Sequence, residues 1–452
     1  MPLLLILALA QAPVAAPPRL LCGFAKRAIT PALGAGPVYL AGFDNDRRAT
    51  GVHDELWARA VAMSDGQQKI AIVSVDLIGL FHDDVRKARE LLEPKVPGAR
   101  LIVASTHGHE GPDTMGLWGR GHFSSGVDRR YLERVRREVA ETAAEAFTRL
   151  KPARLVLGET RTPGLVEDGR LPRVIDDTLV AIQAVGEDGS TLGTVVDWSS
   201  HPEALGGKNT LVTSDYPHFL RTRVEERLGG TCVFLVGAIG GLMTPLGLKL
   251  TGPDGAAIPA DTFALARAVG ERAAEAALEA LRTGMPSVST ALEHRTATVF
   301  VPLENRLFRL AMFLGVLDRG VFSAGRPATS LFGDDLRTEA GYLRIGEAEA
   351  LLVPAEIYPE LVRGGIQDPQ DPGADFPGAP RERPLFTLLS SRHRLVIGLA
   401  NDEIGYVIPR SQWDATRPFA YGRSEAQYGE VNSCGPSTAA RLAEAYARLL
   451  GR

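Results

Sequence analysis

Short apolar strands alternate with amphipathic helices between residues 69 and 237, and this alternation constrains the fold more than any other feature of the chain. Within 128–150, for example, Tyr131, Leu132, Val135 and Val139 recur close to helical spacing. Strands are expected at 70–75, 101–104, 154–158, 178–186, 191–199 and 232–236, and helices at 83–92, 128–150 and 218–228. This order predicts an α/β fold in which mixed β-sheets are flanked by helices.

The second half of the chain has a looser pattern. A helix is expected at 260–282, and residues 288–300 alternate like a strand with one exposed face. Shorter strands are expected at 342–345, 350–353 and 395–399, a surface loop at 368–383 and a final helix from 436. Because no internal repeat divides the sequence, we expect one large catalytic unit rather than a string of small domains.

Composition and cysteine content exclude some classes of protein. The 452 residues are 45% hydrophobic, which suffices for a large core, and the formal net charge of −4 argues against a nucleic-acid-binding protein. The three cysteines form no C-x-x-C pair. Cys22 and Cys434 could form a disulfide in an oxidising compartment, although their spacing does not require it.

The N-terminal residues resemble a secretory signal. Pro2 to Ala10 is an unbroken apolar run, and Ala10-Gln11-Ala12 has the A-x-A pattern of a cleavage site. The run is too short to span a membrane comfortably, which takes about 20 residues. We therefore expect residues 1–18 to be a leader, cleaved after Ala12 or Ala16, and the protein to be secreted or periplasmic. A wrongly assigned start or a loosely attached apolar tail is the alternative.

Two histidines follow the apolar strand at 101–104. His107 and His109 lie within Ser105–Asp113, and catalytic groups of open α/β sheets collect at the carboxyl ends of strands. Residues two apart point to the same side while the chain is extended. The two histidines could therefore share a metal ion, or one could bind it while the other faces a substrate. A polar loop with two solvated histidines remains the alternative.

Three further segments have the same layout, in which a strand is followed by a side chain that can bind a metal ion. His201 follows the strand at 191–199, Glu356 follows the strand at 350–353, and Glu403 and Tyr406 follow the strand at 395–399. Zinc accepts histidine nitrogen and carboxylate oxygen, and it lowers the pKa of bound water to near neutrality. The residue types suit zinc, but their spacing does not show that they meet.

At these four segments the chain resembles the neutral/alkaline, non-lysosomal ceramidase family. The family motif T-H-T-H-S-G-P matches Thr106 to Pro112, with Gly108 in place of Thr and Glu110 in place of Ser. The H-P motif matches His201-Pro202, and S-x-D-[FY] matches Ser214-Asp215-Tyr216 in shortened form. The resemblance also includes residues 23–31, 41–43, 51–60 and 73–77, and extends from about residue 20 to the end of the chain.

The resemblance implies a ligand set and a cofactor. Zn²⁺ would be held by His107, His201, Glu356 and Tyr406, and His109 would face the scissile group as a hydrogen-bond donor or proton shuttle. Close by in sequence, Leu117, Trp118 and Phe123 would either contact an acyl chain or serve only to pack the loop; both interpretations stay open.

One segment departs from the family pattern. Where the family has G-D-[VQ]-[SN]-P, this chain has Gly240-Gly241-Leu242-Met243-Thr244-Pro245, so the Asp is missing and Thr244 replaces the Ser proposed as catalytic. We keep Thr244 as a second candidate catalytic residue beside His109. Water is the expected nucleophile, because the nearby acid is missing and no histidine adjacent in sequence could activate a hydroxyl. Residues 19–452 are expected to form the catalytic domain alone, without the family's C-terminal immunoglobulin-like domain.

Taken together, the resemblance implies a secreted, zinc-dependent amidohydrolase of sphingolipid metabolism. It would hydrolyse the N-acyl amide bond of ceramide or a related lipid by metal-activated water, with transient contact to a membrane surface. A zinc hydrolase of the same fold that acts on a non-sphingolipid amide or ester is the first alternative. A secreted, non-catalytic binding protein is the second. A barrel-type amidohydrolase is disfavoured, because eight strand–helix repeats are not visible.

Overall fold

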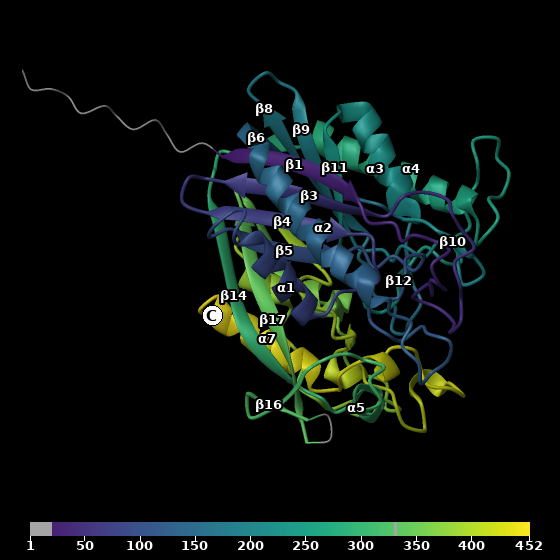
Figure 1. Ribbon diagram of the computed structural model, residues 1–452. Helices are drawn as coiled ribbons and strands as arrows, with labels where there is room; N and C mark the ends of the chain where they lie inside the picture. The colour runs from purple at the N-terminus through teal and green to yellow at the C-terminus, as the bar shows by residue number, and fades with distance from the viewer. Residues whose placement is uncertain (1–19, 330–331) are drawn as a thin grey trace, which may run out of the picture.

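A computed structural model describes residues 20–329 and 332–452, so the expected leader at 1–18 lies outside the described residues. Two mixed sheets build the core, and helices cover their outer faces (Figure 1). This arrangement confirms the expected α/β class with mixed sheets flanked by helices. Among the described residues, no helix is both long and apolar enough to cross a membrane.

The larger sheet has nine strands in the order β11-β9-β8-β6-β1-β3-β4-β5, with β13 beside β6. Only the pairs β4–β5 and β9–β11 are parallel. The strands are β1 (Leu21–Ala28), β3 (Trp57–Ser64), β4 (Lys69–Val75), β5 (Arg100–Ser105), β6 (Lys151–Arg161), β8 (Thr178–Gly186), β9 (Thr191–Trp198), β11 (Thr231–Val236) and β13 (Met285–Pro286).

The strands β1 and β6 join two halves of this sheet through only the pairs Leu21–Pro152 and Cys22–Lys151. The two halves pack against each other. The Ser74 hydroxyl on β4, for example, donates to the Phe234 carbonyl on β11 at 2.6 Å. The result is a sandwich whose inner layers are the halves β1-β3-β4-β5 and β6-β8-β9-β11.

The second sheet has six strands in the order β16-β15-β17-β18-β20, with β14 paired to β17. Leu343, Leu352 and Ile397 from this sheet join the apolar core between the halves of the larger one. The strands are β14 (Leu292–Pro302), β15 (Val321–Ser323), β16 (Arg326–Ala328), β17 (Asp335–Ile345), β18 (Ala348–Leu352) and β20 (His393–Ile397).

Helices cover the outer faces of these sheets. The pair α1 (His82–Leu92) and α2 (Arg129–Thr148) packs on the half with β4, and α3 (Tyr216–Leu228) and α4 (Phe263–Arg282) pack on the half with β9. The second sheet is covered by α7 (Thr438–Leu449). Local sequence sets the starts of the helices: the Asp128 side chain caps α2 and the Thr262 side chain caps α4 by accepting free backbone N–H groups.

Strand β4 shows why strands of the larger sheet have continuous apolar sequences. Ile70 and Ile72 face the core between the sheets, whereas Ala71 and Val73 face α1 and α2. Successive side chains of a strand point to opposite faces, and here both faces are covered. Burying each large aliphatic side chain contributes roughly 1.5–3 kcal/mol.

The remaining elements lie in the connections. They include three short two-stranded sheets: β2 (Gly51–Val52) with β10 (Leu211–Val212), β7 (Glu167–Asp168) with β12 (Met243–Thr244), and β19 (Glu356–Ile357) with β21 (Tyr406–Val407). The short helices are α5 (Arg306–Phe313), α6 (Pro359–Arg363) and the single turns Leu385–Leu388, Arg410–Gln412, Ala420–Gly422 and Glu430–Asn432. Two of the three short sheets, β7–β12 and β19–β21, position residues of the site described below.

All three cysteines are buried and free. Cys22 lies in the core between the sheets and Cys434 in the core under α7, so the disulfide left open by the sequence is not formed. The Cys434 thiol donates instead to the Ile404 carbonyl at 3.2 Å.

Candidate metal centre and the adjoining cavity

His107 lies in the loop that leaves β5, and its ring is fixed by the backbone of another strand end. Its Nδ1 is 2.7 Å from the Ile78 carbonyl oxygen, so Nδ1 carries the proton and Nε2 is left free. The backbone φ of His107 is +64°, a left-handed conformation that costs energy for a residue with a Cβ. Such strain persists only where the surroundings enforce it, and it clusters at functional sites.

His201 follows β9 and is oriented in the same way. Its Nδ1 is 2.8 Å from the Met243 carbonyl oxygen, and its Nε2 is 2.9 Å from Glu356 Oε2. A backbone acceptor on one ring nitrogen fixes the tautomer and aims the other nitrogen, as in histidines that bind metals.

Glu356 and Tyr406 are neighbours because their strands pair in parallel register, Glu356 opposite Tyr406. Both are buried, and burial together with the negative charge of Glu356 raises the pKa of Tyr406 well above its usual value. Glu356 Oε2 also lies 3.4 Å from His107 Nε2. The structure thus brings together all four residues that the family resemblance implied as zinc ligands.

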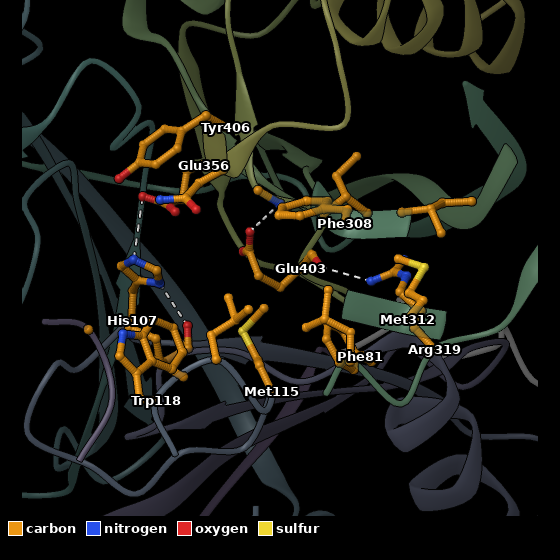
Figure 2. Close-up of a pocket in the computed structure, with 18 of the residues that line it drawn as sticks. Phe81, His107, Met115, Trp118, Phe308, Met312, Arg319, Glu356, Glu403 and Tyr406 are labelled. Atoms are coloured by element: carbon orange, nitrogen blue, oxygen red, sulfur yellow. Dashed lines mark hydrogen bonds and ion pairs between the residues drawn. The ribbon is translucent and has the colours of Figure 1, made fainter. Parts of the chain in front are cut away.

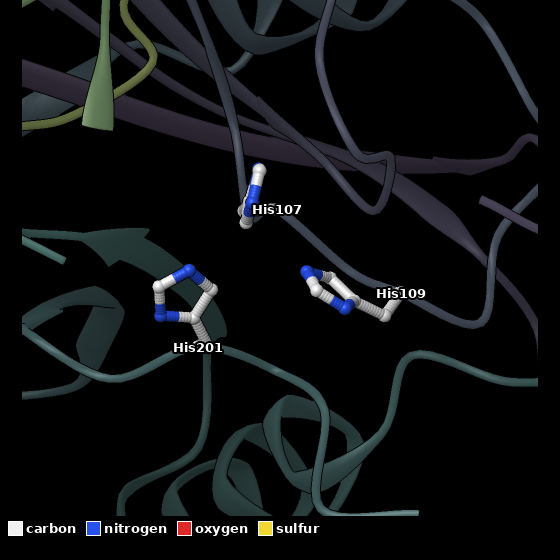
Figure 3. Close-up of side chains that lie close together, drawn as sticks. All are labelled: His107, His109 and His201. Carbon is white, nitrogen blue, oxygen red and sulfur yellow. The ribbon is translucent and has the colours of Figure 1, made fainter. Parts of the chain in front are cut away.

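His109 completes a group of three imidazoles with His107 and His201 (Figure 3). The ring centroids are 5.0–5.7 Å apart, and one nitrogen from each ring lies within 4.8 Å of the others. Both nitrogens of His109 are buried and make no hydrogen bond of good geometry among the described residues, although the Glu203 carboxylate lies 3.2 Å from Nδ1. Buried polar groups rarely stay unpaired, so an ion or substrate at this point would fit the residues present.

The backbone around His109 is held by a buried ion pair that sequence reasoning missed. Arg47 donates to the carbonyl oxygens of Ala41 and His109 and pairs with Glu110 at 3.0 Å. Glu110 also accepts from Asn209 at 2.8 Å. Glu110, which replaces the Ser of the family motif, therefore forms a buried ion pair with Arg47.

Gly42 gives the His109 ring its space. A Cβ at residue 42 would lie 2.3 Å from His109 Cγ, and the φ of Gly42 is +94°. Any other residue would therefore displace the ring and strain the backbone.

Burial and neighbouring charges shift the pKa values of the group in different directions. Burial alone would raise the pKa of Glu356, but the charges and hydrogen bonds of His107 and His201 hold it well below its usual range. Burial lowers the pKa of His201, yet the hydrogen bond and charge of Glu356 and the charge of Glu203 raise it to about 8. Burial, followed by the charges of His107 and His201, lowers the pKa of His109 well below its usual value.

Thr244, on β12, does have an acid beside it. Its hydroxyl donates to Glu203 Oε1 at 2.5 Å, and its oxygen accepts from the Leu246 N–H at 3.0 Å. Glu203 Oε2 lies 3.2 Å from His109 Nδ1, so Glu203 stands between the two candidate catalytic residues. The sequence argument that no acid is near Thr244 is therefore wrong: the acid comes from the His201-Pro202-Glu203 segment, where its position directly after the H-P motif was the only signal.

The Ser214-Asp215-Tyr216 motif has a supporting role in this geometry. Asp215 caps α3, and the Tyr216 hydroxyl donates to the Ser200 carbonyl at 2.6 Å. That bond fixes the chain directly before His201.

An apolar cavity opens beside this group of side chains (Figure 2). His107, His109, Glu356 and Tyr406 line one part of it, whereas Thr244 and Glu203 do not line it. Leu117 and Trp118 line the cavity and also pack against the neighbouring core, so both sequence interpretations stay open for them, whereas Phe123 is 75% exposed and outside the lining. The rest of the wall is mainly apolar: Ile78, Phe81, Met115, Phe308, Met312, Leu317, Leu336 and Ile404.

Comparison with known proteins gives matches among solved structures. No family model and no curated protein sequence matches the chain. The neutral ceramidase from Pseudomonas aeruginosa superposes with a TM-score of 0.72 at 18% identity, covering 96% of this chain and 74% of that one. A ceramidase complexed with C2 superposes with a TM-score of 0.71 at 18% identity, covering 96% and 75%. The chain therefore has the neutral ceramidase fold over nearly its whole length.

Proposed function

We propose that the protein is a zinc-dependent hydrolase that cleaves the N-acyl amide bond of ceramide or a related lipid. The observation that carries the proposal is the meeting of His107, His201, Glu356 and Tyr406 beside an apolar cavity, on the fold of the neutral ceramidases. Three of these four residues, His107, Glu356 and Tyr406, line the apolar cavity, and two imidazoles, a carboxylate and a phenol suit zinc.

The chain's own residues have distinct tasks in this proposal. Zinc supplies a Lewis acid that polarises a carbonyl and lowers the pKa of water. Ile78 and Met243 aim the imidazoles of His107 and His201, and the pairing of β19 with β21 places Tyr406 beside Glu356. His109 is neutral at physiological pH and lines the cavity, so it can accept a proton or donate a hydrogen bond to a developing oxyanion.

Water remains the proposed nucleophile, now for a structural reason. Thr244 is buried and outside the cavity lining, and its proton is already donated to Glu203. We propose that Thr244 and Glu203 position His109 instead of attacking the substrate.

Metal analysis combined with an acyl panel tests the proposal. The purified protein should contain about one zinc per chain and release fatty acid from ceramide. His201→Ala should lose both metal and activity, whereas His122→Ala, an exposed histidine outside the group, should lose neither. Turnover of short N-acyl compounds or esters alone would favour a hydrolase of the same fold with another substrate. Absence of both zinc and turnover would favour a binding protein.

We also propose transient contact with a membrane or micelle surface, through α5. This helix contributes Phe308 and Met312 to the cavity wall, while Leu307 and Phe313 on its other side are 60% and 54% exposed. One apolar helix would thus border both the cavity and the lipid from which a substrate is drawn. Export through cleavage after Ala12 or Ala16 completes the proposal, and N-terminal sequencing of exported protein tests it.

A further inference from the structure

Glu403 is a buried carboxyl group in the cavity wall with no assigned role. It is 3% exposed and lines the same cavity as His107 and Glu356. Figure 2 shows it between the end of the cavity that holds these two residues and the end that holds Arg319. Its Oε1 accepts the Gly405 N–H at 2.6 Å, whereas its Oε2 is buried without a partner among the described residues.

The cation nearest to this carboxyl is already paired. Arg319 donates through both terminal nitrogens to Asp402, and its Nη1 also donates to the backbone carbonyl of Glu403 at 2.8 Å. Phe81, Met115 and Leu336, which line the same cavity, are apolar and offer no hydrogen bond. Within residues 20–329 and 332–452, the free oxygen of Glu403 is therefore left without a hydrogen-bond partner.

An unpaired carboxyl oxygen in an apolar cavity is costly, and a ligand group that pairs with it recovers that cost. Burial, followed by the negative charge of Glu356, raises the pKa of Glu403 well above its usual range. A hydroxyl is the simple group that suits either form of the side chain, because it donates to a carboxylate and accepts from a carboxylic acid.

We propose that Glu403 is the specificity-determining residue of the cavity, and that its free carboxyl oxygen hydrogen-bonds a hydroxyl group on an otherwise apolar ligand. This inference rests on the proposed function for the kind of ligand, a long-chain N-acyl compound. It adds that the ligand carries a hydroxyl group in the apolar part of the cavity, and that Glu403 binds this hydroxyl.

Non-hydrolysable ligands test this without depending on turnover. Three sulfonamides serve as probes: hexadecanesulfonyl ethanolamine, its deoxy counterpart hexadecanesulfonyl ethylamine, and the ethylamide with a hydroxyl on the second carbon of the sulfonyl chain. Binding to the zinc-loaded protein is followed by isothermal titration calorimetry. At least one of the two hydroxylated probes should bind about ten- to a hundredfold more tightly than the deoxy probe, which is the range expected for one hydrogen bond to a charged group.

Two variants and a control assign the effect to Glu403. In Glu403→Leu the preference should fall to about onefold, and in Glu403→Gln to an intermediate value, since an amide still forms one neutral hydrogen bond. Glu360→Gln is the matched control, because Glu360 is also a buried acid with an unpaired oxygen but is outside the cavity lining. Its preference should equal that of the wild type. If Glu403→Leu does not fold, Glu403→Gln decides.

Three results would overturn the inference: equal affinity of the wild type for all three probes, an undiminished preference in both Glu403 variants, or loss of zinc from Glu403→Gln, which would make the residue a metal ligand. The proposed function fails in a different way. If the protein prefers a hydroxylated probe through Glu403 but hydrolyses no N-acyl compound, the role of Glu403 stands and the proposed enzymatic function is refuted.

Discussion

Replacing Thr244 separates its proposed positioning role from covalent catalysis. Thr244→Val keeps the shape of the side chain and removes the hydroxyl, whereas Thr244→Ser keeps the hydroxyl and removes one methyl group. In the structure that hydroxyl donates to Glu203 at 2.5 Å and accepts from the Leu246 N–H at 3.0 Å. The two variants therefore differ in two hydrogen bonds.

The magnitudes follow from those two bonds. Loss of a hydrogen bond to a charged group costs roughly 1.5–3 kcal/mol, and loss of a neutral one roughly 0.5–1.5 kcal/mol. Thr244→Val should thus lower the free energy of unfolding by about 2–4 kcal/mol. Thr244→Ser should lower it by about 1 kcal/mol, the contribution of one buried methyl group. If Thr244 only positions His109 through Glu203, Thr244→Val should lower kcat/KM about ten- to a hundredfold, or ~1.4–2.7 kcal/mol.

The assay measures kcat/KM on a fluorescent N-acyl substrate, zinc per chain, and the first turnover in a stopped-flow instrument. We expect Thr244→Val to retain zinc and residual activity, Thr244→Ser to be close to the wild type, and no burst of the first product. A Thr244→Val protein that is folded, zinc-loaded and inactive, together with a burst in the wild type, would refute the water mechanism. It would make Thr244 the nucleophile of an acyl-enzyme, with Glu203 as its base.

Three further predictions concern the surroundings of the site. In the metal-free protein the pKa of His201 is raised from 6.5 to about 8, so the stability that its protonated form contributes should be complete below about pH 6.5 and lost as the pH rises through about 8. Zinc affinity should rise over the same interval, because zinc binds the neutral imidazole. Urea unfolding and zinc titration, each at about pH 6 and about pH 9, measure the two effects. Gly42→Ala should push the His109 ring aside and lower activity at least about tenfold with zinc retained; unchanged kinetics would show that the ring tolerates the displacement. Replacing exposed Leu307 and Phe313 with Ser should lower turnover of vesicle-bound ceramide more than turnover of a soluble short-chain substrate, and an equal effect on both would remove α5 from membrane contact.

The elements that the sequence predicted are those whose local pattern agrees with their burial. Helix α4 and strands β4, β5 and β11 appear within a few residues of their expected bounds. Strands β1 and β3 were not predicted, although they lie in the middle of the larger sheet. Trp57–Ser64 contains three alanines, which favour helix locally, and its pairing with strands on both sides overrides that preference.

The sequence identified the candidate ligands, but it did not show that they lie close together in the fold. Each follows a strand, a local feature, whereas their contact depends on long-range pairing such as that of His201 with Glu356, 155 positions apart. The residues that support them carry weaker signals still. Arg47, Glu203 and Glu403 are single charged residues in loops, and only the folded chain shows that each is buried beside the site.

The parallel pairing of Glu356 with Tyr406 has a consequence for the biogenesis of the protein. One donor comes from the loop after β5, one from the loop after β9, and the last two from a short sheet near the end of the chain. A nascent chain on the ribosome, or a chain threaded through a translocon, holds only part of this set until its final segment emerges. If this group binds an ion as proposed, the complete set of donors can hold it only after that segment has emerged, so the metal supply of the compartment where the chain folds would decide which ion the site receives.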